Sequence, residues 1–136
     1  MSKSAIYTAN ISEQNVPSDG VINLGTIIRR YGPNVNLSGN AIQISGAGYY
    51  DIDANFTVAP SEAVSDVTIS LFKNGVLVPG ASATFFVETA NTQVTIPISC
   101  LVREFCNCCE ETSSLTFILS GAPAVVSNVA VVVEKL

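Results

Sequence analysis

The side chains best suited to chemistry are four cysteines, three of which lie close together at Cys106, Cys108 and Cys109. Cysteine thiolates bind zinc, but a structural four-cysteine zinc site usually has two separated Cys-x-x-Cys pairs. The spacing here does not follow that pattern, and adjacent cysteines such as Cys108 and Cys109 rarely bond to each other. We therefore expect no metal site in the single chain. Two alternatives stay open, namely disulfides between subunits of an assembly and reduced thiols on a loop. Three copies of the loop meeting in a trimer could also share a metal.

A pair of carboxylates, Asp51 and Asp53, is the second group to consider. It lies in a stretch that alternates apolar and polar residues from Tyr50 to Val58, which predicts a half-buried strand. At strand spacing the carboxylates share one face about 7 Å apart. Such pairs hold calcium in some proteins, yet a polar row facing solvent or a symmetry axis is the simpler interpretation.

Catalytic chemistry is not supported by the residues present. The sequence has no histidine, so the usual base for a serine or cysteine nucleophile is missing. No helix is predicted, so no glycine-rich phosphate loop precedes one, and there is no tryptophan to grip a sugar. We expect a protein that is not an enzyme and has no catalytic residues and no cofactor.

Composition narrows the class of partner. The chain has 136 residues, of which 48% are hydrophobic and only 12% charged, with a net charge of -5. Six Lys and Arg residues in no basic run give little to neutralise a phosphate backbone, so we expect no nucleic acid partner. No apolar run is long enough for a signal peptide or a membrane span. So few charges indicate a surface that partners cover.

Strand signals follow one another along the chain without helical periodicity. The Asn74-Gly75 dipeptide suits a type I′ turn and predicts a hairpin between flanking strands. With turn clusters between them, the predicted strands span residues 5–9, 21–24 and 26–31 (as a pair), 41–44, 49–60, 67–73, 76–78, 83–88, 93–102, 114–120 and 126–134. In the 93–102 strand, Cys100 points to the core.

The last predicted strand is apolar on both faces, which is typical of a strand covered on both sides. In a two-sheet sandwich one cover is the other sheet, and the second is most easily another subunit. We therefore expect Val129, Val131 and Val133 to contribute to a subunit interface. The chain is interpreted as an N-terminal arm, residues 1–20, and an all-β domain, residues 21–136, built as an antiparallel sandwich or jelly roll of about ten strands.

Three segments give the chain a family resemblance: Gly48-x-Tyr50-x-Ile52, the run from Leu71 to Gly80 around Asn74-Gly75, and the closing strand that ends Val131-Val132-Val133-Glu134. Together they resemble a tumour-necrosis-factor-like (complement globular head-like) jelly roll, most of all the C-terminal domain of collagen-like glycoproteins of bacterial spore surfaces. The resemblance covers roughly residues 40–136. The chain differs from the spore proteins in its cysteine cluster and in having no Gly-x-y stalk.

The resemblance implies a ten-stranded fold, a compact homotrimer and termini gathered at one end. It also implies that the strand from Gly48 and the closing strand belong to the sheet that faces the threefold axis, so that Asp51 and Asp53 line that axis. The cysteine loop then lies at the terminal end, where Cys106, Cys108 and Cys109 would staple or anchor it.

These expectations favour a structural display protein, mounted by its terminal end on a larger particle. A phage virion decoration or head-fibre component fits best, because the collagen stalk is missing. Two alternatives remain, a module that binds a glycan or receptor through residues 60–66 or 89–92, and a spore-surface structural protein.

Overall fold

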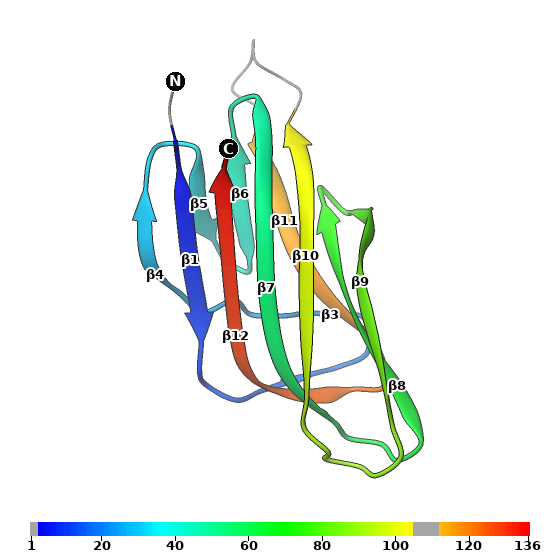
Figure 1. Cartoon of the computed structure of the whole chain (residues 1–136). Coiled ribbons are helices and arrows are strands. Elements are labelled where there is room, and N and C mark those ends of the chain that lie inside the picture. Colours follow the sequence, from blue (N-terminus) through cyan, green and yellow to red (C-terminus); the bar gives the residue numbers. More distant parts are fainter. Residues whose placement is uncertain (1–2, 105–111) are drawn as a thin grey trace.

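The computed structural model describes residues 3–104 and 112–136, and in these residues every regular element is a β-strand. The strands form two sheets that pack face to face (Figure 1). Sheet A consists of β1 (Ala5–Asn10), β2 (Gln14–Val16), β4 (Thr26–Tyr31), β7 (Gly48–Pro60), β10 (Val94–Glu104) and β12 (Ala124–Lys135). Sheet B consists of β3 (Gly20–Val21), β5 (Val35–Ser38), β6 (Ala41–Ser45), β8 (Ser65–Lys73), β9 (Val76–Val87) and β11 (Thr112–Gly121).

The strand order is that of a jelly roll, and the fold predicted from the sequence is confirmed. Sheet A runs β10-β7-β12-β1-β4 and sheet B runs β5-β6-β11-β8-β9, with every pair antiparallel. These ten strands are supplemented by the short β2 beside β12 and β3 beside β11. The N- and C-terminal ends lie close together at one end of the sandwich, hereafter the terminal end (Figure 1).

The strand β7 follows the alternation seen in the sequence. Its buried side chains are Tyr50, Ile52, Ala54, Phe56 and Val58, and the strand ends at Pro60. A slip of one residue would bury Asp51 and Asp53, so the register is fixed by the cost of burying charge. β7 pairs with β10 on one side and β12 on the other, which places its polar row near the middle of sheet A.

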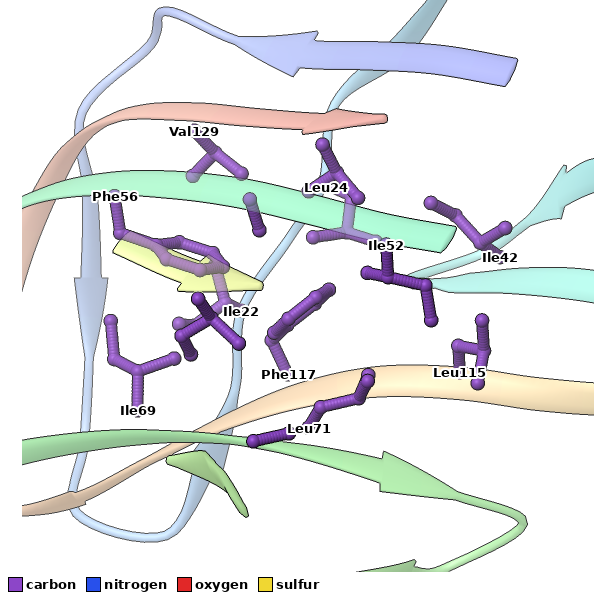
Figure 2. Packing of buried hydrophobic residues seen from close by; sticks show 14 of the residues in the cluster. Ile22, Leu24, Ile42, Ile52, Phe56, Ile69, Leu71, Leu115, Phe117 and Val129 are labelled. Atoms are coloured by element: carbon purple, nitrogen blue, oxygen red, sulfur yellow. The ribbon is translucent and has the colours of Figure 1, made fainter. Parts of the chain in front are cut away.

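The core lies between the two sheets and takes apolar side chains from both of them. Figure 2 shows Phe56 of β7 and Phe117 of β11 meeting in its centre, with ring centroids 5.0 Å apart and planes inclined by 58°. That tilted geometry is favourable for an aromatic pair. Because Phe56 belongs to sheet A and Phe117 to sheet B, their contact joins the two layers.

The predicted turn at Asn74-Gly75 is confirmed, whereas the two strands predicted after it form one strand. Asn74 and Gly75 both have positive φ angles of 52° and 80°, as a type I′ turn requires, and they join β8 to β9. Residues 76–78 and 83–88, predicted as two strands, belong with the exception of Glu88 to the single β9. The pairing of β9 with β8 shifts register opposite Leu71. Gly80, with φ of 82°, lets the chain pass through that irregularity.

The predicted pairing of residues 21–24 with residues 26–31 is wrong. Gly25 has a φ angle of 85°, and an added Cβ atom there would lie 2.1 Å from the Ala9 carbonyl oxygen. The chain turns at this glycine from sheet B to sheet A, so β3 pairs with β11 while β4 pairs with β1.

The first residues of the chain are part of the sandwich. β1 lies between β12 and β4, and the Ile6 side chain is buried in the core. This corrects the boundary between an arm of residues 1–20 and a domain of residues 21–136. The alternation in residues 5–9 already predicted a strand, but its central position depends on pairing with distant strands, which local sequence does not specify.

The valines of the closing strand also need a correction. Val129, Val131 and Val133 have no exposed surface, because they point between the sheets of one chain. We expected a neighbouring subunit to cover them, whereas sheet B does so. The opposite face of β12 carries Val132, which is 39% exposed, and it is that face which a partner could cover.

Candidate subunit interface

The outward side of sheet A, hereafter the sheet A face, gathers large apolar side chains in solvent. They come from all five long strands and are between 37% and 56% exposed: Tyr7, Tyr31, Tyr49, Leu101 and Val132. Strand pairing sets these positions, because residues that lie opposite one another in the ladder share a face.

Two rows of side chains cross the sheet A face from β10 to β4. Each row follows directly from the register of the ladder. The row nearer the terminal end is Leu101, Asp51, Glu134, Ala5 and Tyr31. The next row is Ser99, Asp53, Val132, Tyr7 and Arg29. Aromatic and aliphatic groups therefore surround a central group of carboxylates.

Like charges stand directly opposite each other in the middle of this face. Asp51 of β7 is the ladder partner of Glu134 of β12, an arrangement that destabilises a strand pair by about 0.2 to 1 kcal/mol. Arg29 lies three strands from β7, at the β4 edge. Within residues 3–104 and 112–136 the structure has one ion pair, between Lys73 and Glu104. Neither of these side chains lies on the sheet A face.

Asp53 is held by its neighbour on β10. The Ser99 hydroxyl donates a hydrogen bond to Asp53 Oδ1 at 2.5 Å. Between Ser99 and Leu101, Cys100 turns to the opposite side of the strand and packs half-buried against the core, as predicted. Burial raises the pKa of the Cys100 thiol, and the charges of Asp51 and Asp53 raise it further.

Two features border the sheet A face near the terminal end. The Arg103 guanidinium lies over the Tyr49 ring, 5.5 Å from its centroid. A small hollow of about 80 Å³ lies across β1 and β4, between Tyr7, Tyr31 and Val132. A side chain of another subunit could insert into this hollow.

A buried charge lies behind the terminal end of β10. Glu104 is almost fully buried, and its Oε1 atom is 3.5 Å from Lys73 Nζ. Its Oε2 atom has no hydrogen-bond partner among the residues that the structure describes. Lys73 Nζ also donates to the Arg103 carbonyl oxygen at 3.1 Å. A groove of about 420 Å³, with walls from β9 and from the end of β10, opens beside Lys73.

Tyr50 lies in the same region. Its hydroxyl is 2.7 Å from the Ser45 carbonyl oxygen and 2.8 Å from that of Gly46. Burial, and secondly the charge of Glu104, raise the pKa of Tyr50 to about 12. The tyrosine therefore ties the end of β6 to β7 in its neutral form.

The residues singled out in the sequence have different outcomes. Asp51 and Asp53 share one face of β7, as predicted, and the sheet A face brings them beside Glu134. Cys106, Cys108 and Cys109 lie outside the described residues. Their flanking positions, Glu104 and Thr112, are at the terminal end, where β10 and β11 meet the ends of β7 and β6.

No cluster of three or more metal-binding side chains occurs among the residues that the structure describes. In that part of the chain there is also no helix able to cross a membrane.

The apolar residues of the sheet A face were missed by sequence reasoning. Tyr7 and Leu101 sit at polar positions of their strands, so the signal was an apolar residue out of phase with the alternation.

Cationic side chains occur in only one half of the sandwich along its length. All six Lys and Arg residues of the sequence lie in the half nearer the terminal end: Lys3, Arg29, Arg30, Lys73, Arg103 and Lys135. The other half holds only carboxylates: Glu13, Asp19, Glu62, Asp66 and Glu88. Four described carboxylates accompany the six cations, so the described residues of the terminal half carry a formal charge of +2 and those of the far half carry -5.

The loops of the far half are tied to each other. Val64 N–H donates to the Glu88 carbonyl oxygen at 3.2 Å, and Asn91 N–H donates to that of Pro60 at 2.8 Å. Val64 is 71% exposed and has a φ of 51°, an unusual angle for a β-branched residue. These loops, 61–64 and 88–93, are hereafter the distal loops.

Comparison with known proteins identifies the fold. No family model matches the sequence, and no curated protein matches it at the sequence level. Among solved structures, murine APRIL (crystallised at pH 5.0) is similar over 98% of this chain and 99% of its own, with a TM-score of 0.70 and 9% identity. Eiger TNF from S. frugiperda is similar over 98% of this chain and 91% of its own, with a TM-score of 0.71 and 9% identity.

A third structure comes from a different kind of protein. The vertex protein P5 of PRD1 is similar over 98% of this chain and 96% of its own chain, with a TM-score of 0.64 and 13% identity. The fold is thus an all-β jelly roll of the TNF-like type, and the similarity covers at least 91% of each of these chains. At such low identities the similarity defines the fold alone.

Proposed function

We propose that this protein is a non-enzymatic structural protein that works as a homotrimer on the surface of a larger particle, and that this particle is a virion. The observation that supports this most is the sheet A face. It combines five exposed apolar side chains with a pair of opposed carboxylates. Such a surface is unfavourable in water, because the apolar groups are exposed and the two like charges repel each other. Covering the apolar groups stabilises an assembly by about 25 cal/mol for each Å² buried.

The partner that fits is a second copy of this chain. Arg29 lies on the same face as Asp51 and Glu134 but at its β4 edge, so a neighbouring copy could bring a cation to the acidic centre. A heterologous contact of this kind closes into a ring when the rotation is suitable. The TNF-like resemblance implies a threefold ring with this sheet inside. The polar row of β7 would then pack against its symmetry mates.

Size measurement tests the trimer. Light scattering on a size-exclusion column should give three times the mass of 14.2 kDa at micromolar concentration. Val132→Glu adds a fourth carboxylate, beside Asp51, Asp53 and Glu134, at the centre of the sheet A face and should yield monomers. Phe86→Glu places the same charge on the outward side of sheet B and should leave the trimer intact. A folded wild-type monomer at these concentrations would refute the proposal.

The virion is proposed as the particle because one of the structural neighbours is by name a vertex protein. The chain termini lie together at one end, so one attachment would leave the rest of the molecule free (Figure 1). We therefore place the attachment at the terminal end. Immunogold labelling of purified particles from the native source should decorate their outer surface, and labelling of spores alone would favour the spore-surface alternative.

The distal loops favour a second candidate function, recognition of a receptor or glycan. They hold an exposed valine in an uncommon backbone conformation, and such conformations persist when the surrounding structure determines them. This function is compatible with display at the end away from the particle. A glycan and cell-surface binding screen with the wild type and Val64→Gly would detect it, and absence of binding at any valency would remove it.

A further inference from the structure

The outward side of sheet B, hereafter the sheet B face, has almost no charge. Of its strands, β3, β5, β6, β9 and β11 contain no Asp, Glu, Lys or Arg, and β8 has Asp66 near one end and Lys73 at the other. Solvent-exposed protein surfaces usually have about 25–35% charged residues. Sheet A has charged residues on four of its strands, so the two faces of one small molecule differ.

Paired hydroxyl groups fill the middle of the sheet B face. Thr68 and Thr84 are ladder partners with hydroxyl oxygens 2.7 Å apart. In the next row the Ser82 hydroxyl donates to Ser70 Oγ at 2.8 Å. The Thr68–Thr84 pair uses one hydroxyl hydrogen internally and leaves the other hydrogen and several lone pairs for a ligand. In the second pair Ser70 is buried, so the exposed Ser82 presents its lone pairs. Ser120 extends the first row on β11.

Apolar and aromatic side chains close the face at both ends. Phe86 stands opposite Asp66 at one end, and Phe72 stands opposite Leu77 at the other. The span along β8 from Asp66 to Phe72 is roughly 20 Å at the rise of an extended strand. Phe86 is 55% exposed, although a side chain of this kind gains free energy when it is covered.

We propose that the sheet B face binds an extended, neutral polysaccharide along β8 and β9. Sugar rings have apolar C–H faces that stack on aromatic rings and hydroxyl groups that both donate and accept hydrogen bonds. The site matches this chemistry with a phenylalanine at each end and hydroxyl pairs between. A phosphate or a polyanion would find no cation along the middle of the face.

The inference goes beyond the proposed assembly and does not depend on it. The sheet B face lies on the opposite side of the sandwich from the sheet A face (Figure 1). A trimer closed through sheet A would therefore present three copies of the site outward, and a polysaccharide with many repeats would be bound with avidity.

The test uses the full chain and soluble neutral oligosaccharides. Cellopentaose, chitopentaose and maltopentaose are titrated into labelled protein, and amide shifts are followed by NMR. Binding of at least one of them should perturb β8 and β9, and Phe86→Ala should weaken it about tenfold. Phe85→Ala is the matched control, since Phe85 is 40% exposed but lies on the opposite side of β9, across from the buried Val67.

The outcomes separate the site from the assembly. Equal affinity of wild type and Phe86→Ala, or shifts confined to the distal loops, would overturn the proposal. No binding of any of the three sugars, and none to insoluble cellulose or chitin in a pull-down, would also overturn it. A change of mass with Phe86→Ala would assign this face to contact between copies instead. Light scattering of wild type alone decides the trimer.

Discussion

The ionisation of one residue, Tyr50, makes the stability of the fold depend on pH. Its pKa is about 12 in the folded chain against an ordinary value of 10.0, so the folded state holds the phenolic proton more tightly. The corresponding stability is complete below pH 10 and is lost as the pH rises toward 12. We expect the free energy of unfolding to fall across that interval, as measured by urea titrations at a series of pH values.

The Tyr50→Phe variant provides the control for this pH dependence. At pH 8 it should be less stable by about 1 kcal/mol, because the hydrogen bond to the Ser45 or Gly46 carbonyl is lost. Between pH 10 and 12 its stability should decline less steeply than that of the wild type. Identical slopes for the two proteins would assign the alkaline loss to other groups.

At the scale of elements, the glycine that ends β11 has a specific role. Gly121 has φ of 87°, and an added Cβ atom would lie 2.4 Å from the Asp66 carbonyl oxygen at the start of β8. Gly121→Ala must therefore move backbone in the β8–β11 pair, and we expect a loss well above the cost of the positive φ alone. Thermal unfolding followed by circular dichroism measures it.

Gly39→Ala is the matched variant for that comparison. Gly39 also has a positive φ, 60°, but an added Cβ atom would meet no atom within 4 Å. Only the conformational cost of about 1 to 2 kcal/mol applies there. If both alanine variants lost the same stability, the contact with Asp66 would be irrelevant.

The ladder between β7 and β12 contains an unfavourable pair that can be relieved. Asp51→Asn removes the repulsion from Glu134 across the strands, and the fold should gain about 0.2 to 1 kcal/mol at low salt. Asp53→Asn should bring no such gain, because Asp53 faces Val132 and accepts the Ser99 hydrogen bond. Denaturant titrations at two salt concentrations would distinguish them, and equal effects would contradict the pairwise explanation.

Sequence patterns predicted the elements better than their partners. Alternation and turn residues identified β7, the Asn74-Gly75 hairpin and the inward side of Cys100, since these depend on near neighbours. The pairing of β1 with β12, and the burial of Val131 by sheet B, depend on contacts between distant segments. An apolar run shows that a strand is covered but not which layer covers it.

The candidate site was predicted only in part for the same reason. Asp51 and Asp53 were found because they occupy successive polar positions of a regular alternation. Their neighbours Glu134 and Tyr7 come from opposite ends of the chain, and only the completed ladder brings them to one face. The sheet B face escaped notice altogether, because serine and threonine on the outer side of a strand look like ordinary solvated positions.

At the scale of the whole molecule, the stability of the proposed trimer depends on charge as well as on buried apolar area. Because the proposed contact brings Arg29 of one copy to the acidic centre of the next, salt should loosen the assembly by screening that attraction. Sedimentation velocity at low and high ionic strength would show the change, and tighter association at high salt would indicate that repulsion between the acidic centres dominates the contact.

The division of charge between the two halves has one more consequence. With every lysine and arginine near the termini and only carboxylates in the far half, the protein possesses an electric dipole along its long axis. A threefold assembly about that axis would add the three moments together. On a positively charged support the molecules should adsorb in one orientation, with the acidic end down and the termini exposed to antibody or protease.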